Sequence, residues 1–486
     1  MPKGAPLHTA LFNADLAPVT PEARSWSTWN IAALWIGMLV NVPSYMLAAA
    51  LVKQGLSWWQ ALLALLLGGL VLLVPLILIG HLGTRYGVPF PVLVRSSFGT
   101  VGAQFAALAR ATAACGWFGI ATWIGGFAVY ELLGSMGWID IANDTHVSFL
   151  GITWMEFACF LAFWALNLAI IIKGIDCVRW LASWSAPFLL VMGLALLTWA
   201  LFKVPNAATL FDQPSRFETN YDFWRVFVPS VTAVVGGWST LSLNIPDFTR
   251  YCREQRQQAW GQVLGVPTTM VLFGLISIVV TEATVILYGQ PIWNPTKLAP
   301  RLGSEVVIVI SLVALVVATL STNIAANVVS PSNDFSNLWP QRISFKAGGI
   351  ITACIGVFIM PWYLVNNLST YIYTWLIGYS ALLGPLAGVI ISDYYLVRRQ
   401  KLDLEAMYDP DGPLQGTNWR AMGVVAVSVL PNLPGFFNAA TKTTFFPAFF
   451  DVIYGYAWFL GLILAFVLYW VVSGGRPRDG RPSGDG

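Results

Sequence analysis

The residues of this sequence that could carry chemistry are tryptophans, amides and hydroxyls inside long apolar segments. Gly236 and Gly237 interrupt the apolar run from about 223 to 245, and Trp238 follows them directly. A glycine in a helix interior costs about 1 kcal/mol relative to alanine, so the pair indicates either a helix break or close approach of two helices. Backbone groups freed by a break are tolerated in a membrane only where they line a cavity or are covered by protein. We predict a break, and a binding cavity that Trp238 faces.

A second tryptophan with a suitable neighbour lies in the third apolar segment. Trp117 and Ala121 are four positions apart, so they share one helix face. Two indole rings from different helices can hold a flat heterocycle between them, each stacked contact contributing about 0.5–1.5 kcal/mol beyond burial. Most of the 23 tryptophans must face lipid or the membrane interface. We predict that Trp117 and Trp238 instead face the cavity.

Hydroxyl and amide side chains cluster near the end of the eighth apolar segment. Ser321 and Thr322 are adjacent, and together with backbone carbonyls freed at a break in the first segment they would offer neutral oxygens to sodium. The alternative is that these hydroxyls bond to carbonyls of their own helix. Asn327 follows about one and a half turns after Thr322. Its amide is therefore placed to reach a substrate while the hydroxyls face an ion.

No catalytic set is visible within the apolar segments. The ionisable residues there form no shared motif, and the three histidines lie outside the segments or at their ends; the residues concerned are Arg110, Glu131, Glu156 and Glu282. A membrane hydrolase or metalloprotease needs a nucleophile with a base, or histidine and carboxylate ligands, inside the bilayer. The five cysteines show no CxxC spacing. The sequence therefore predicts neither an enzyme nor a bound cofactor.

The elements that must position these residues are membrane helices. Of the 486 residues 57% are hydrophobic and 10% are charged, whereas about a quarter are charged in a soluble domain. Apolar segments of about 20 residues suit helices that cross a hydrocarbon core about 30 Å thick. The net charge of +3 gives no indication of a nucleic-acid partner. We expect about twelve spans, near 30–52, 57–81, 101–133, 148–171, 182–203, 222–246, 261–288, 304–330, 346–365, 370–397, 420–440 and 451–473.

The spans are arranged as two related halves. Asn41-Val42-Pro43 interrupts the first span and Gly236-Gly237-Trp238 the sixth. Because the interruptions are an odd number of spans apart, the second unit is inverted, as in transporters with a midplane site between discontinuous helices. A simple kink at Pro43 is the alternative. The predicted domains are a cytoplasmic segment 1–29, repeats 30–203 and 222–397 of five helices each, two peripheral helices in 420–473, and a disordered cytoplasmic tail 475–486.

Lysine and arginine set the expected orientation. With the N-terminus inside, about eighteen of the 26 basic residues fall in cytoplasmic segments. We therefore expect a multi-pass protein of the cell (plasma) membrane with both termini cytoplasmic. We also expect the protein to function as a monomer, with the lipid bilayer as its surroundings.

Several motifs in order resemble the nucleobase-cation symporter-1 family of cytosine, uracil, thiamine, allantoin and hydantoin permeases. The resemblance runs from about 23 to 399 and implies an all-α fold with a ten-helix inverted repeat of the leucine-transporter type, broken helices 1 and 6, and two further C-terminal helices. The motifs are Gly116-Trp117-Phe118-Gly119, Gly236-Gly237-Trp238, Asn244-Ile245-Pro246-Asp247-Phe248-Thr249-Arg250 and Ser321-Thr322-Asn323-Ile324-Ala325-Ala326-Asn327, supported by Gly83-Thr84-Arg85-Tyr86-Gly87, Trp293-Asn294-Pro295 and Gly384-Pro385-Leu386-Ala387-Gly388 with Ser392-Asp393-Tyr394.

The resemblance also implies site residues. Trp117 and Trp238 would bracket the substrate ring, with hydrogen bonds from the Gly237 backbone, Asn327 and Asn41. A sodium site would use the carbonyls of Gly37, Val40 and Ala318 with the hydroxyls of Ser321 and Thr322. The family often has glutamine at the position of Ala121, and the hydantoin transporters have it at the position of Asn41. Both changes shorten or delete an amide and bear on which substrate is carried.

These observations predict a secondary active symporter that imports a small planar nitrogen heterocycle, of nucleobase, allantoin or hydantoin type, by alternating access. Sodium is the expected coupling ion. Proton coupling is one alternative, because Glu282 could titrate, and a passive facilitator of the same fold is another. The sequence does not single out one heterocycle.

Overall fold

The computed structural model describes residues 9–145, 151–173, 188, 191–212, 214–292, 294–365 and 370–474. Eight of the described helices are long and apolar enough to cross a membrane, and two bent helix pairs add one possible span each. Two shorter apolar helices, Val191–Lys203 and Phe345–Phe358, match the fifth and ninth predicted spans. The prediction of an all-α membrane protein is therefore confirmed. The start of the predicted fifth span and the predicted tail 475–486 lie outside the described residues.

The helices follow the chain in the order of the predicted spans. The first half contains α1 (Thr28–Leu39), α2 (Val42–Lys53), α3 (Trp58–Tyr86), α4 (Phe90–Leu93), α5 (Arg95–Ser135) and α6 (Trp154–Lys173). The second contains α8 (Asn220–Asn244), α9 (Pro246–Thr249), α10 (Gln255–Tyr288), α11 (Pro295–Leu298), α12 (Glu305–Asn327), α13 (Val329–Leu338), α14 (Phe345–Phe358), α15 (Trp362–Val365) and α16 (Ile377–Ser392). The π-helical turns η6 (Thr370–Leu376) and η7 (Asp393–Val397) flank α16, and α17 (Trp419–Val429), α18 (Leu433–Thr441), α19 (Ala448–Gly455) and α20 (Ala457–Val472) follow.

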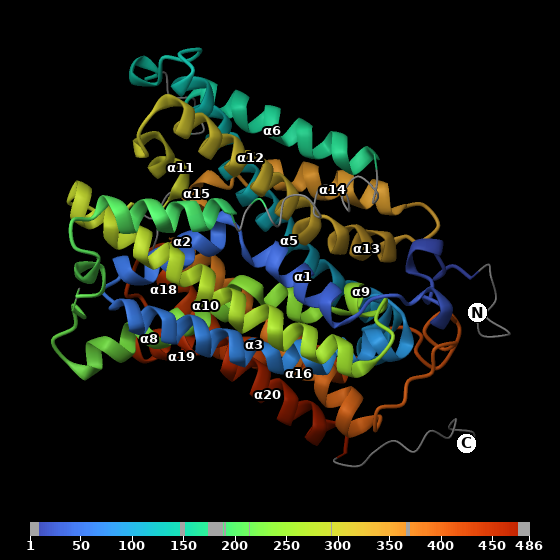
Figure 1. The fold of residues 1–486 in the computed structure, drawn as a ribbon. Coiled ribbons are helices and arrows are strands. Elements are labelled where there is room, and N and C mark those ends of the chain that lie inside the picture. Colours follow the sequence, from blue (N-terminus) through green and yellow to red (C-terminus); the bar gives the residue numbers. More distant parts are fainter. Residues whose placement is uncertain are drawn as a thin grey trace, which may run out of the picture.

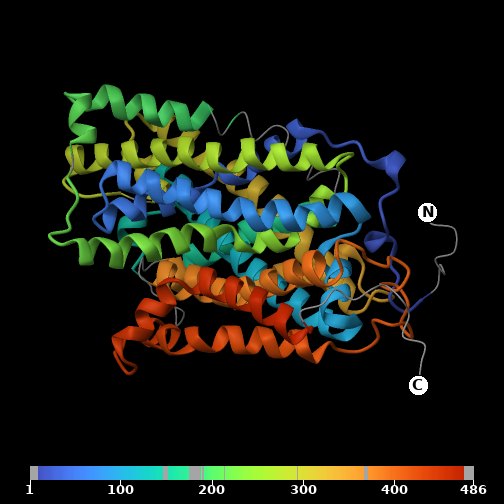
Figure 2. The same ribbon diagram turned by 90° about the horizontal axis from the view of Figure 1, so that it is seen from below.

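The spans form one bundle in which most helices run along a common direction (Figure 1). Helices α17 to α20, coloured orange to red, lie along one side of it, where α20 packs against α16 (Figure 2). On the other side of α16, α5 packs against α12, and α1 packs against α10. Both described ends of the chain lie at the same end of the bundle (Figure 1).

The predicted break in the first span is confirmed. Helices α1 and α2 meet at an angle of 63°. The Asn41 side chain caps α2 by accepting a hydrogen bond from the Ser44 N–H at 2.7 Å, and it donates to the Met38 carbonyl at 2.6 Å. Pro43 lies in the first turn of α2, where its missing N–H has no helix partner to lose. Pro43 therefore begins a new helix instead of kinking a continuous one.

The predicted break in the sixth span is wrong, because α8 runs through Gly236 and Gly237 without interruption. A Cβ atom on Gly236 would lie 2.5 Å from the Leu376 carbonyl oxygen and 2.7 Å from Ser380 Oγ. Gly236 therefore serves close approach to the segment η6–α16, the alternative considered for the glycine pair. A Cβ atom on Gly237 would meet only Leu47 Cδ2, at 3.8 Å. This second glycine leaves open space between α8 and α2.

A correspondence between the halves supports the repeat boundaries that we propose. A short helix precedes the third span of each half, α4 before α5 and α11 before α12, and the two long helices pack on each other. We therefore retain 1–29, 30–203, 222–397, 420–473 and 475–486 as the proposed division of the chain.

Candidate functional site

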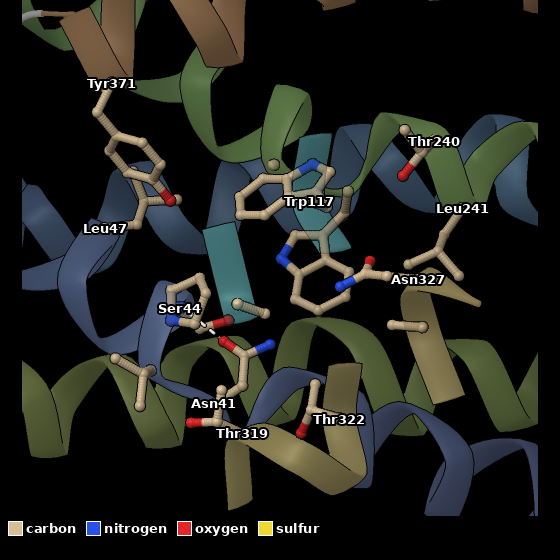
Figure 3. Close-up of a pocket in the computed structure, with 16 residues that line it drawn as sticks. Asn41, Ser44, Leu47, Trp117, Thr240, Leu241, Thr319, Thr322, Asn327 and Tyr371 are labelled. Carbon is tan, nitrogen blue, oxygen red and sulfur yellow. Dashed lines mark hydrogen bonds between the residues drawn. The ribbon is translucent and has the colours of Figure 1, made fainter. Parts of the chain in front are cut away.

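One cavity is lined by all six residues expected to surround the substrate. The space between its lining atoms, open solvent included, is about 590 Å³. Helices α2, α5, α8 and α12 and the turn η6 form its wall around the first-span break (Figure 3). The predicted residues are Asn41, Trp117, Ala121, Gly237, Trp238 and Asn327, and the others are Val42, Pro43, Ser44, Leu47, Thr240, Leu241, Thr319, Thr322, Ala326 and Tyr371.

Trp117 is held in place by side chains from α16 and η6. Its indole Nε1 donates a hydrogen bond to the Tyr379 hydroxyl at 3.1 Å, and that hydroxyl donates in turn to the Gly236 carbonyl of α8. The rings of Tyr371 and Trp375 meet the Trp117 ring edge-on, each with centroids 6.3 Å away. The three aromatic residues of α16 and η6 thus fix the ring that faces the cavity.

Sequence reasoning missed these three supporting aromatic residues. Tyr371, Trp375 and Tyr379 recur at intervals of four, which is the spacing of one helix face. That periodicity was the available signal, although it does not say which helix the face contacts.

Trp238 is held by a different partner. Its ring packs edge-on against the fully buried Trp35 of α1, with centroids 5.9 Å apart and an angle of 68° between the planes. On the same turn of α8, the Ser239 hydroxyl donates to the Gly236 carbonyl at 2.9 Å. The ring of Trp238 is therefore supported from α1, whereas that of Trp117 is supported from η6 and α16.

The two predicted amides point into the cavity from different elements, Asn41 from the first-span break and Asn327 from the end of α12 (Figure 3). Asn327 Nδ2 donates to Asn323 Oδ1 at 3.0 Å, and the buried Asn323 amide donates to Thr122 Oγ1 at 3.1 Å and to Asn167 Oδ1 at 3.2 Å. This chain of polar groups from α5, α6 and α12 fixes the Asn327 amide. The Asn41 amide is already bonded across the first-span break on both its oxygen and its nitrogen, leaving one N–H for a ligand.

The cavity carries no ionised side chain among the residues described as lining it. Its polar groups are amides, hydroxyls and indole N–H groups, and the Thr319 hydroxyl is buried without a hydrogen-bond partner in the described structure. Ala121 adds a small apolar surface beside Trp117. An uncharged ligand suits this lining, because an unpaired charge in such surroundings would lose its hydration without compensation.

The residues expected to bind sodium lie where α1 ends against α12. The Val40 and Ala318 side chains are in contact, and the Thr322 hydroxyl donates to the Gly37 carbonyl at 3.4 Å. The Asn41 N–H bonds to the Leu39 carbonyl and not to Gly37, so the helix itself does not use the Gly37 carbonyl. Ser321 is buried on the same stretch of α12. Carbonyl and hydroxyl oxygens of this kind fit a hard monovalent cation.

The ionisable residues of the spans lie elsewhere. Glu282 is buried on α10 and is not part of the cavity lining. Arg110 of α5 forms an ion pair with Asp334 of α13 at 3.2 Å, where both side chains are almost fully buried. Arg110 Nε also donates to Asn244 at the end of α8, at 3.2 Å. This pair therefore joins three helices near the end of the bundle that holds the chain termini.

The profile of a protein family described as permeases for cytosine/purines, uracil, thiamine and allantoin matches residues 18–461. The chain belongs to this family. It is 41% identical to the purine-uracil permease NCS1 of Arabidopsis thaliana over 469 residues, which are 95% of this chain and 78% of that protein. It is 36% identical to the allantoin permease of Bacillus subtilis over 473 residues, covering 96% of this chain and 94% of that one.

Solved structures of a related transporter share this fold. Mhp1, a nucleobase-cation-symport-1 family transporter in a closed conformation with bromovinylhydantoin bound, superposes with a TM-score of 0.76 at 26% identity, covering 95% of each chain. Its inward-facing conformation gives 0.75 at 26% identity. The amino-acid complex of MhsT, at 15% identity and a TM-score of 0.54, shows the fold alone. The predicted leucine-transporter-type fold is thereby confirmed. The prediction that the protein is a transporter and not an enzyme is confirmed as well.

Proposed function

We propose that this permease is a secondary active symporter that imports a small planar nitrogen heterocycle by alternating access, with sodium as the coupling ion. The observation that carries the proposal is a cavity in which two tryptophans and two asparagines converge and whose described lining residues include no ionised side chain. Relatives described as purine-uracil and allantoin permeases support a substrate of nucleobase, allantoin or hydantoin type.

Recognition follows from the chemistry of such rings. Their faces are flat and polarisable, and they suit contact with the indoles of Trp117 and Trp238, each worth about 0.5–1.5 kcal/mol beyond burial. Their edges alternate N–H and C=O groups, which pair with the amide of Asn327 and the remaining N–H of Asn41. The uncharged lining favours a neutral heterocycle over a charged metabolite of similar size.

Coupling would operate through the first-span break, which both proposed sites share. Thr322 lines the substrate cavity and also bonds to the Gly37 carbonyl, while Asn41 lines the cavity and bonds to the Met38 carbonyl one residue further on. An ion held by these oxygens would order the break and so the cavity wall. By linkage, sodium then raises the affinity for substrate, and substrate raises the affinity for sodium by the same factor.

Proton coupling has less support. It would require a titrating group that senses the substrate, and Glu282, the candidate carboxylate, lies on α10 outside the cavity. Within the described lining, Tyr371 is the one residue with a titratable side chain.

Uptake into proteoliposomes tests the proposal. Labelled uracil, cytosine, allantoin, hydantoins and thiamine are offered with an inward sodium gradient, with choline in place of sodium, or with an inward proton gradient. We expect one or more of these rings to accumulate above the external concentration with sodium, and an ionophore to abolish the accumulation. Equilibration without accumulation would instead identify a facilitator, and accumulation with protons alone would identify a proton symporter.

Substitution of the tryptophans tests the cavity. We expect Trp117→Ala and Trp238→Ala to abolish uptake while the protein still reaches the membrane, and the phenylalanine variants to retain part of it. Trp138→Ala provides the control, since Trp138 follows α5 and is 72% exposed. Normal affinity in both alanine variants would refute the role of the indoles.

We further propose a cell-membrane location with both termini cytoplasmic and a monomer as the functional unit. The described ends of the chain share one end of the bundle, which fits this orientation (Figure 1).

A further inference from the structure

A second cavity lies beyond the central one along α5. It lies between α2, α5, α6 and the short helices α11 and α15, and the space between its lining atoms, open solvent included, is about 740 Å³. These short helices lie towards the end of the bundle opposite the described chain ends (Figure 1). On α5, Ala121 lines the central cavity and Ile124, one turn further on, lines the second. On α2, Leu47 lines the central cavity and Met46 lines the second. The two cavities are therefore lined by neighbouring positions of α5 and α2.

The wall of the second cavity includes an aromatic surface. Trp123 and Phe127 of α5 both line it, and their ring centroids are 6.0 Å apart. The Trp123 ring is supported by Trp362 of α15 at 5.5 Å and by Phe160 of α6 at 6.2 Å. Because three helices pack around this ring, its position is fixed before any ligand arrives. Such a surface favours a flat molecule.

Polar side chains line the second cavity beside the aromatic surface, and they include one basic and one acidic residue. The Lys297 ammonium group lies 5.9 Å from the centre of the Phe127 ring. Asn294 uses its side-chain oxygen to accept from the Thr296 N–H at 3.0 Å and the Thr296 hydroxyl at 2.7 Å, so its NH₂ group is left for another partner. Lysine and asparagine thus offer donors to a carbonyl group in the cavity.

Glu156 supplies the acceptor. One of its oxygens accepts from the Thr153 N–H at 2.8 Å while the Glu156 N–H bonds to the Thr153 hydroxyl at 3.1 Å, an arrangement that caps α6 and fixes the side chain. The Thr153 hydroxyl and Tyr130 both donate to Asp144, which ties this cap to α5. Within the described structure the other Glu156 oxygen accepts no hydrogen bond. It is therefore available to an N–H donor.

We infer that this cavity is a second binding site for the transported heterocycle, occupied on the way to the central site; the inference rests on the proposed function. A flat ring with neighbouring C=O and N–H groups matches the aromatic surface, the Lys297 and Asn294 donors and the Glu156 acceptor. A simple anion or cation fits less well, because each would meet one side chain of its own sign. In the proposed orientation the cavity opens on the external side and receives substrate first.

Equilibrium binding to the purified full-length protein tests this inference. Each labelled ring of the transport panel, namely uracil, cytosine, allantoin, hydantoins and thiamine, is titrated onto wild type, Trp117→Ala, the double variant Lys297→Met with Glu156→Gln, and the combination of all three changes. Glutamine keeps the helix cap, and methionine keeps the apolar part of the lysine. Lys203→Met is the matched control, because Lys203 is exposed and lies outside the cavity.

We expect wild type and Lys203→Met to bind two molecules of the active ligand, Trp117→Ala and the double variant one, and the triple variant none. In uptake assays the double variant should raise KM about tenfold, as expected for loss of charge-assisted hydrogen bonds, with central-site affinity unchanged. One molecule bound by wild type, with an unchanged KM in the double variant, would overturn the second site alone. No binding of any ring of the transport panel would overturn the proposed function and, with it, this inference.

Discussion

The two adjacent glycines of α8 allow a matched test of how the cavity is built. A methyl group on Gly236 would lie 2.5 Å from the Leu376 carbonyl oxygen, a backbone atom that cannot rotate away, so α8 and η6 must separate. A methyl group on Gly237 would meet nothing closer than Leu47 Cδ2 at 3.8 Å and would extend into the cavity. We expect Gly236→Ala to destabilise the protein, and Gly237→Ala to impair substrate binding at normal stability.

The magnitude follows from the difference between the two variants. Both gain the same helix propensity, about 1 kcal/mol for alanine over glycine, and this contribution cancels in the comparison. The remaining difference is the cost of overpacking at Gly236, about 1–3 kcal/mol. Gly236→Ala should therefore be the less stable of the two by that amount, whereas Gly237→Ala should equal or exceed the wild type in stability.

Thermal unfolding in detergent ranks the stabilities, and uptake in proteoliposomes reports the function of the same samples. The expected result is a lower melting temperature for Gly236→Ala than for Gly237→Ala, together with weaker substrate affinity in Gly237→Ala. If Gly236→Ala melts at or above the temperature of Gly237→Ala, the close contact with Leu376 does not constrain the helix, and the assignment of separate roles to the two glycines is wrong.

Three further predictions concern the cavity wall and the ion site. Tyr379→Phe should lower substrate affinity about fivefold through loss of the bond that orients Trp117, with expression unchanged; unaltered affinity would show that packing alone holds the indole. Thr322→Ala should raise the sodium concentration needed for half-maximal uptake, while Thr322→Ser, which keeps the hydroxyl, should not; equal effects would refute ion coordination by this oxygen. Ala121→Gln should favour an unsubstituted ring over one with an apolar substituent on that edge, because a buried amide left without a partner costs about 1–3 kcal/mol; an unchanged ranking of a matched ligand pair would show that this position does not contact the ring.

Part of the cavity could be predicted from local signals. Trp117 and Ala121 share a helix face by spacing, and Trp238 directly follows a glycine pair. The roles of Asn41 and Gly237 were implied only by the resemblance to the permease family. The structure places them at one cavity, and what each does to a substrate remains a prediction. Local signals also located the spans, since hydropathy and length suffice for membrane helices.

The continuity of α8 could not be predicted from the chain around it. A glycine pair weakens a helix to the same extent whether it marks a break or a close contact, and the deciding atom, the Leu376 carbonyl, lies far along the chain. Tyr379 illustrates the same limit, because its hydroxyl joins Trp117 of α5 to Gly236 of α8. Contacts between distant segments set both features, and the local sequence does not show which segment is contacted.

The absence of ionised side chains from the described cavity lining has an electrical consequence. In the proposed sodium cycle, the loaded carrier moves the charge of the ion, whereas the cavity of the empty carrier adds no charge of its own on the return. Membrane voltage therefore acts on the loaded step. A potential of 100 mV contributes about 2.3 kcal/mol per charge, which corresponds to about a fiftyfold concentration ratio of the heterocycle across the membrane.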